Sequence, residues 1–367
     1  MLDRLPSELV DHILDFTDTW PEEERPNTFY RLSLVNKKVG ERAQKALYYD
    51  LRTDSTWFRK KLVGTLQENE QAREAVKALT IVHDHAGTSE ILETCPNVQR
   101  IVFDHTFQLS VSSFKGFKPL PSVMVLTCVH MDKSPALDPI CLPNLVELTI
   151  SFTYFRPGEM DRFFNSAALP SLKALAISLI YDYGGRPPFP QTFPNLPLDF
   201  VAQLDMLQIS SVDLDYVNPA IFRSPTPILL TTTFITRVGP AVFDLKRLEQ
   251  YTRLAPPHIC FAEPHAGYFE CAKEVPQTLE CLINLAVLVS SPSKPFSLQL
   301  PHFLQRIDAA LIPETSARLE ELMRACGENG VEVVWHSMRT SGWAELRKDF
   351  WRYAKAFKED GRGVRRM

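Results

Sequence analysis

Several kinds of targeting and processing signal are missing from this chain of 367 residues. No apolar run is long enough for a membrane-spanning helix, and the N-terminus lacks the basic, apolar and small-residue succession of a secretory signal. There is no Asn-x-Ser/Thr glycosylation acceptor, and the seven cysteines are odd in number and scattered rather than arranged as a disulfide framework. We therefore expect a protein of a reducing compartment, cytoplasmic or nuclear, that does not engage a membrane.

Motifs of catalysis and cofactor binding are missing as well. No glycine-rich phosphate loop, G-x-S-x-G elbow, Cys-x-x-Cys knuckle or H-E-x-x-H helix is present. Three pairs of residues would each place two potential metal ligands on one face of a strand: His83 and His85, Cys128 and His130, His258 and Cys260. No sequence motif supplies the further ligands that a four-coordinate metal site would need. Asp213 and Asp215 resemble the metal-binding pair of a sugar-nucleotide enzyme, although a solvated turn is the simpler interpretation. We expect no enzyme, no cofactor and no metal.

The charge of the chain is nearly balanced overall but uneven along its length. With 40 basic and 44 acidic residues, the net charge of −4 provides no general basic field for nucleic acid. Residues 1–28 hold eight acids and two bases, whereas residues 339–367 hold nine bases and four acids. We therefore expect no nucleic-acid partner, and a C-terminal segment that is locally basic.

Residues 5–51 contain helical patterns separated by an acidic insert. The stretch reads LPSELVDHILDF, then the insert at 17–28, then TFYRLSLVNKKVGERAQKALYYDL. Pro6 fixes the approach to the first helix and Ser7 can cap it, and apolar residues recur at helical spacing afterwards. Three short helices have too small a core to be very stable alone. Their apolar face is therefore expected to be shared with a partner or with the next domain.

LPSEL, the Ile13-Leu14 pair, RLSLVNKK and the closing ALYYDL resemble the F-box family, over residues 1–51 of the 367. The resemblance implies docking onto the small adaptor subunit of an SCF-type ubiquitin ligase and, through it, a cullin. The chain departs from the family in its long 17–28 loop and at Val39, where many F-boxes carry a large aromatic residue. An ordinary helical cap on an unrelated domain is the alternative. The residues that the resemblance places against the adaptor are Leu5, Pro6, Leu9, Ile13, Leu14, Leu32 and Val35.

From residue 76 a short pattern recurs: an apolar residue or Cys, Pro, a polar residue, then apolar-x-x-apolar-x-apolar. Its copies are CPNVQRIVF (95–103), LPSVMVLTC (120–128), LPNLVELTI (142–150) and LPSLKALAI (169–177), while residues 76–81 and 201–209 keep only the strand portion. Successive prolines are 25, 22 and 27 residues apart. A short strand and a return connection of this length close one turn of a solenoid, and a Pro ahead of the strand removes no ladder hydrogen bond.

This pattern resembles the leucine-rich-repeat family in an irregular form. The resemblance implies a curved solenoid with parallel strands and outer helices, and short helices are expected at 89–93 and 160–165. The asparagine ladder of the family is not consistently present. Residues 181–197, rich in Pro and Gly, are expected to form a long excursion that either meets a partner or has no role. A non-repetitive α/β domain is the alternative.

Beyond residue 219 the repeat gives way to alternating strand and helix patterns, which favour parallel pairing. Strands are expected at 228–235, 258–262, 285–289 and 331–335, and helices at 244–253, 267–273, 301–310 and 316–326. The segment 343–359 has an apolar stripe and a basic surface, so it is either a cap on the last repeat or a docking element for an acidic segment. The stripe consists of Trp343, Leu346, Phe350, Tyr353 and Phe357.

The sequence thus predicts an α/β protein with four parts. These are an F-box-like helical domain (1–51), a linking helix (52–75), an irregular leucine-rich-repeat-like solenoid (76–340) and a basic amphipathic helix with a tail (341–367). The expected function is a substrate-recognition adaptor of an SCF-type ligase with an unidentified protein target; the alternative is a ligase-independent repeat scaffold. The alternation of side chains along the strands predicts five exposed positions that could contact the target: Gln99, Arg100, Glu147, Lys173 and Gln208. The alternative is that these side chains are simply solvated.

Overall fold

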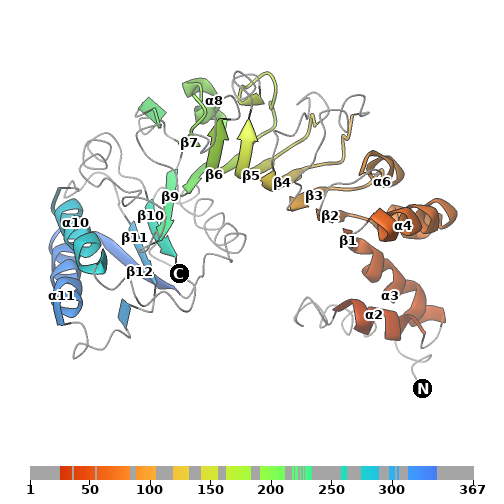
Figure 1. The fold of residues 1–367 in the computed structure, drawn as a ribbon, viewed down its shortest axis with the longest axis horizontal. Coiled ribbons are helices and arrows are strands. Elements are labelled where there is room, and N and C mark those ends of the chain that lie inside the picture. The colour runs from red at the N-terminus through yellow and green to blue at the C-terminus, as the bar shows by residue number, and fades with distance from the viewer. Residues whose placement is uncertain are drawn as a thin grey trace. The chain divides into compact units, whose positions relative to one another are not determined.

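The fold is α/β with parallel strands, and it is seen in a computed structural model (Figure 1). The residues that the structure describes are 25–34, 37–53, 56–82, 88–104, 119–131, 142–155, 163–182, 191–210, 217–218, 220–221, 224, 226, 228–233, 258–262, 274–288, 297–301, 304–305 and 313–336. The chain divides into two compact units. Unit 1 is Met1–Tyr154 with Leu169–Ser171, and unit 2 is Phe155–Ala168 with Leu172–Met367.

Helices α2 (Arg25–Ser33) and α3 (Lys37–Tyr49) lie side by side at the start of unit 1 (Figure 1). Phe29, Val39 and Ala43 are buried, and together they supply apolar contact for this pair of helices. Gly40 lies at the closest approach, since a Cβ built there would be 2.7 Å from the backbone oxygen of Ser33. α2 and α3 confirm that the second half of the 5–51 stretch is helical, as its apolar spacing predicts.

Replacing Gly40 with Ala should lower the free energy of unfolding by about 1–3 kcal/mol, because the added methyl group meets a backbone oxygen that cannot rotate away. Gly64, inside α4 (Thr56–Glu68), is the matched control because a Cβ added there would have no atom within 4 Å. Gly64→Ala should stabilise the protein by about 0.5–1 kcal/mol through helix propensity alone. Urea denaturation of both variants measures the difference, and an equal effect of the two would contradict the close helix approach.

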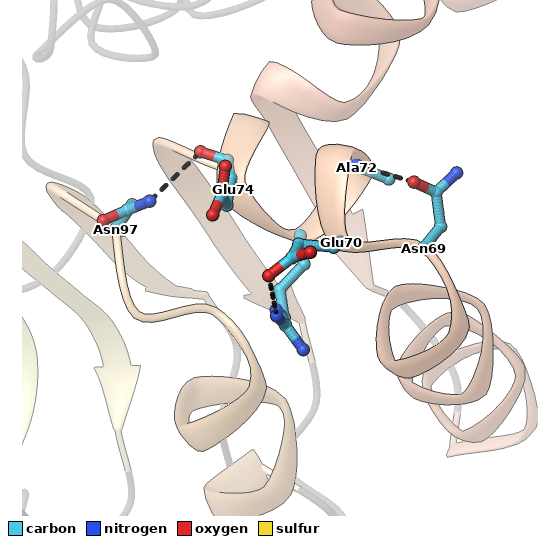
Figure 2. A network of polar contacts seen from close by, with 6 residues as sticks. Asn69, Glu70, Ala72, Glu74 and Asn97 are labelled. Atoms are coloured by element: carbon cyan, nitrogen blue, oxygen red, sulfur yellow. Dashed lines mark hydrogen bonds and ion pairs between the residues drawn. The ribbon is translucent and has the colours of Figure 1, made fainter.

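The segment 52–75, expected to be one helix, is divided into a strand and two helices. Strand β1 (Asp50–Thr53) comes first, followed by α4 and then α5 (Glu70–Ala75). Asn69 separates the helices because its backbone is extended and its side-chain oxygen accepts a hydrogen bond from the Ala72 N–H at 3.0 Å (Figure 2). The expectation of a single linking helix is therefore wrong, and the sheet begins at residue 50 rather than near residue 76.

The sheet of unit 1 is parallel, in the order β1, β2 (Ala78–Val82), β3 (Arg100–Asp104), β4 (Val125–Met131) and β5 (Glu147–Phe155). The strands predicted from the Pro-containing repeat are confirmed, as is the helix at 89–93, which is α6 (Thr88–Thr94). Strand register aligns buried side chains in two rows, which form the core of the unit: Leu79, Ile101, Leu126 and Leu148, and next to them Ile81, Phe103, Cys128 and Ile150.

Unit 2 continues the alternation of helices and parallel strands. Its strands are β6 (Ala174–Asp182), β8 (Met206–Ser210), β9 (Ile228–Thr233), β10 (His258–Ala262), β11 (Ser297–Pro301) and β12 (Glu332–His336), in that order. The short β7 (Gln191–Thr192) pairs with β6 in the antiparallel direction. Its helices are α8 (Leu198–Gln203), α10 (Glu274–Leu288) and α11 (Pro313–Glu328). The strands predicted at 258–262 and 331–335 and the helix at 316–326 are confirmed.

One prediction for unit 2 is wrong, and two others can be compared with the structure only in part. The segment 285–289 is expected to form a strand, but most of it belongs to α10, in which the buried residues recur at helical spacing: Leu279, Leu282, Ile283 and Ala286. Of the helix expected at 301–310, the structure describes three residues: Pro301 is the last residue of β11, a strand that the sequence did not predict, and residues 304–305 form a helical turn. Of the helix expected at 160–165, residue 163 is helical, whereas residues 164 and 165 form bends.

Part of the predicted unit 2 cannot be compared with the structure. The helices predicted at 244–253, 267–273 and 343–359 lie outside the described residues. None of the described helices is long and apolar enough to cross a membrane.

Candidate functional site

The coils that lead into β3, β4 and β5 share one hydrogen-bond arrangement. The carbonyl oxygen of Lys77 accepts from the backbone N–H groups of Gln99 and Arg100, at 2.8 and 3.0 Å. The Gln99 oxygen accepts in the same way from Met124 and Val125, and the Met124 oxygen from Val146 and Glu147. This recurrence, one coil after another, is the structural counterpart of the repeat seen in the sequence.

In three of the four Pro-containing turns, the polar residue after Pro ties the turn to the preceding coil. Asn97 donates its side-chain N–H to the backbone oxygen of Glu74 at 3.4 Å (Figure 2). Asn144 donates to the oxygen of Pro121 at 2.8 Å, and the Ser171 hydroxyl donates to the oxygen of Pro143 at 3.0 Å. The repeat therefore has a side-chain ladder, carried by the position after Pro. The sequence showed this position as polar but did not reveal its role.

Removing the Asn144 side chain should lower the free energy of unfolding by about 0.5–1.5 kcal/mol, the net value of one such hydrogen bond. Ser122 occupies the equivalent position in the neighbouring turn, and within the described part of the chain its hydroxyl makes no hydrogen bond. Ser122→Ala should therefore change stability by less than about 0.5 kcal/mol. Urea denaturation compares Asn144→Ala with this control, and equal destabilisation would contradict a ladder.

The turns and the residues just ahead of the strands line a groove of about 440 Å³ in unit 1. We call it the turn groove. Met124 is a large apolar side chain within it that is 45% exposed, and Lys77 is half-buried at the coil ahead of β2. Its lining residues are Lys77, Asn97, Gln99, Pro121, Ser122, Met124, Asn144, Val146 and Ser171.

The nominated target-contacting residues of unit 1 are accessible to different degrees. Gln99 is exposed and lines the turn groove. Arg100 is exposed and forms an ion pair with Asp50, two strands away, across the small side chain of Ala78. Glu147 is half-buried. Gln99 is thus the nominated residue that contributes to the turn groove.

The two nominated residues of unit 2 differ from one another. Lys173 is exposed, and its Nζ lies 3.5 Å from the backbone oxygen of Gln203. Gln208 is only 2% exposed, so the prediction that it is exposed is wrong. The register places Gln208 between Ala176 and Leu229, which are buried as well, so this row belongs to the interior and not to a partner surface.

Most of the residues expected to contact an adaptor lie outside the described part of the chain: Leu5, Pro6, Leu9, Ile13, Leu14 and Val35. Leu32, in α2, is half-buried. On either side of it, Tyr30 and Leu34 are 58% and 69% exposed. The sequence did not nominate these two, although both belong to the motif that resembles an F-box.

Nucleophilic or metal chemistry finds little support among the described residues. No group of three or more His, Cys, Asp or Glu side chains in the described ranges could hold a metal ion. Burial raises the pKa of the Cys95 and Cys326 thiols to about 11 and raises that of Cys128 further still. These thiols are therefore protonated near neutral pH and poor nucleophiles. His83, His85, Asp213 and Asp215 lie outside the described residues.

No family model matches the chain, and no curated protein sequence matches it either. The comparisons therefore identify neither an F-box nor a leucine-rich repeat.

Proposed function

We propose that this protein is a substrate-recognition subunit of an SCF-type, cullin-based ubiquitin ligase. In this proposal the N-terminal helices act as an F-box that docks on the adaptor subunit. The coils form an irregular, curved leucine-rich-repeat-like solenoid that presents a target protein, and residues 343–359 cover its last coil. Such a subunit acts in the cytoplasm or nucleus and carries out no bond chemistry of its own. It raises the effective concentration of the target near the ubiquitin-carrying enzyme.

The observation that carries this proposal is the exposed apolar surface formed by α2 and the residue that follows it. Tyr30 and Leu34 both project a large side chain into solvent from the short motif that resembles an F-box. Exposed apolar side chains gathered within one sequence motif are typical of a protein–protein contact. Between α2 and α3, by contrast, Phe29, Val39 and Ala43 are buried. The helix pair therefore supplies a packed support and leaves other apolar residues free to meet a partner.

A matched pair of leucine substitutions tests this docking surface. Leu34→Asp should weaken association with the adaptor at least about tenfold, because a carboxylate would be desolvated in the contact. Leu198, 50% exposed at the start of α8, is the control, and Leu198→Asp should leave association unchanged. The measurement is co-purification of the full chain with the adaptor of its host, followed by titration of the purified proteins.

The two leucine variants also separate docking from general damage. Since both leucines are largely exposed, neither substitution should alter the thermal unfolding of the chain. Equal binding by the two variants would contradict docking through α2. Failure of the wild-type chain to bind the adaptor at all would leave the ligase-independent repeat scaffold as the better description.

A further inference from the structure

We infer that the turn groove binds an extended, acidic peptide segment, with a carboxylate of the peptide placed on Lys77. The biological role of this binding rests on the proposed function. The inference adds which part of the solenoid recognises the target and what chemistry the recognised segment has. The peptide-binding step itself is tested independently of the adaptor.

The dimensions of the turn groove favour a single extended chain. Its lining residues come from successive coils, from Lys77 ahead of β2 to Ser171 beyond β5. With neighbouring strands about 4.8 Å apart, this span is on the order of 15–20 Å. An extended peptide of about five or six residues covers that length.

The charge of the lining residues favours an acidic occupant. Among the described residues that line the turn groove, Lys77 is the only charged one, and none is acidic. In the described part of the chain, Lys77 makes no ion pair, and no carboxylate accepts a hydrogen bond from its ammonium group. Arg100, the next cation along the sheet, is already paired with Asp50. Lys77, a half-buried residue, thus supplies the one positive charge that the described lining residues offer to a ligand in this groove.

The remaining lining residues suit the main chain and an apolar side chain of a peptide. Asn97 and Asn144 each use one side-chain N–H to bind the preceding coil, which holds the carboxamides in place and leaves their oxygens as acceptors. The exposed carboxamide of Gln99 can both donate and accept. Fixed amide groups of this kind match the alternating N–H and C=O groups of an extended chain. Met124 offers an adaptable apolar contact beside them.

A charge-reversal experiment tests the inference. A phage library of random linear peptides is selected on the purified full chain, both as wild type and as Lys77→Glu. The wild type should enrich peptides with Asp or Glu at one fixed position, and the variant should enrich Lys or Arg there instead. A synthetic peptide selected on the wild type should bind Lys77→Glu at least about tenfold more weakly, because like charges then face one another. Met124→Ala should weaken binding by a smaller factor.

The outcomes distinguish this inference from the docking proposal. Because the Lys77 side chain makes no hydrogen bond or ion pair in the described part of the chain, Lys77→Glu should unfold at the wild-type temperature and still bind the adaptor. No enrichment, enrichment without an acidic preference, or an unchanged preference in Lys77→Glu would each overturn the inference. Displacement of the selected peptide by a random single-stranded DNA would also overturn it. Loss of adaptor binding in the wild type, with the acidic preference intact, would instead overturn the ligase assignment alone.

Discussion

Replacing Ile13 and Leu14 together with Asp should reduce affinity for the ligase adaptor at least about 100-fold. The F-box resemblance places both side chains in the docking face, and a contact of that kind depends on a few buried apolar anchors. Two carboxylates desolvated without partners would oppose association by several kcal/mol, of which about 2.7 kcal/mol already corresponds to a 100-fold loss. The measurement is titration of the purified full-length variant with purified adaptor.

The neighbouring acidic residues provide the control for this double variant. Asp11→Asn with Asp15→Asn changes the same short segment without placing a charge in its apolar stripe, and it should bind as the wild type does. Peptide selection by the turn groove should be unaffected in both double variants. If the Ile13 and Leu14 variant retained wild-type affinity, the residues that the F-box resemblance assigns to docking would be wrong.

Replacing Phe103 with Ala should lower the free energy of unfolding of unit 1 by about 3–5 kcal/mol, the usual cost of removing a buried aromatic side chain. Phe103 is fully buried in β3, and the register places it between Ile81 and Cys128, both of which are also buried. The cavity left behind cannot collapse easily because strands on both sides fix its walls. Urea denaturation followed by the fluorescence of the chain measures this loss.

Val102 is the control for the core substitution. It lies next to Phe103 but points to the opposite face of the sheet, where it is half-buried. Val102→Ala should therefore cost only about 1 kcal/mol or less. A comparable loss for Val102 and Phe103 would contradict the assignment of the face that carries Phe103 as the core side of unit 1.

The strands of unit 1 were predictable because two signals agreed. Apolar residues alternate at the period of a strand, and a Pro-containing turn marks the start of the copies ahead of β3, β4 and β5. β1 carried neither signal: its sequence, DLRT, has one apolar residue among polar ones. It is a strand because β2 pairs with it in parallel. This pairing joins segments that are distant in the chain, so the local sequence of β1 does not reveal it.

The error in α10 has a different cause. A short apolar run fits a buried strand and a buried helix equally well, and only the spacing over a longer stretch distinguishes them. In α10 that stretch begins at Glu274, well before the apolar run at 285–289. Gln208 was misassigned for a related reason, since strand parity gives the face of a side chain but does not show whether that face is covered.

The candidate site was only partly predictable. Gln99 was identified because it stands between core positions of a clear strand pattern. Lys77 and Met124 were not, because they become neighbours only when successive coils stack. The role of Asn97, Asn144 and Ser171 was likewise hidden, since each binds a backbone oxygen 23 to 28 residues earlier in the chain.

The binding of purified wild-type chain to the purified ligase adaptor, measured by isothermal titration calorimetry, tests the proposed function most directly. The account predicts a one-to-one complex with a Kd below about 1 μM, equivalent to at least about 8 kcal/mol of binding free energy. Apolar burial in the contact should also give a negative heat-capacity change. A folded chain that gives no binding heat at any of several temperatures, with the adaptor at concentrations up to about 100 μM, would contradict the assignment as a ligase subunit.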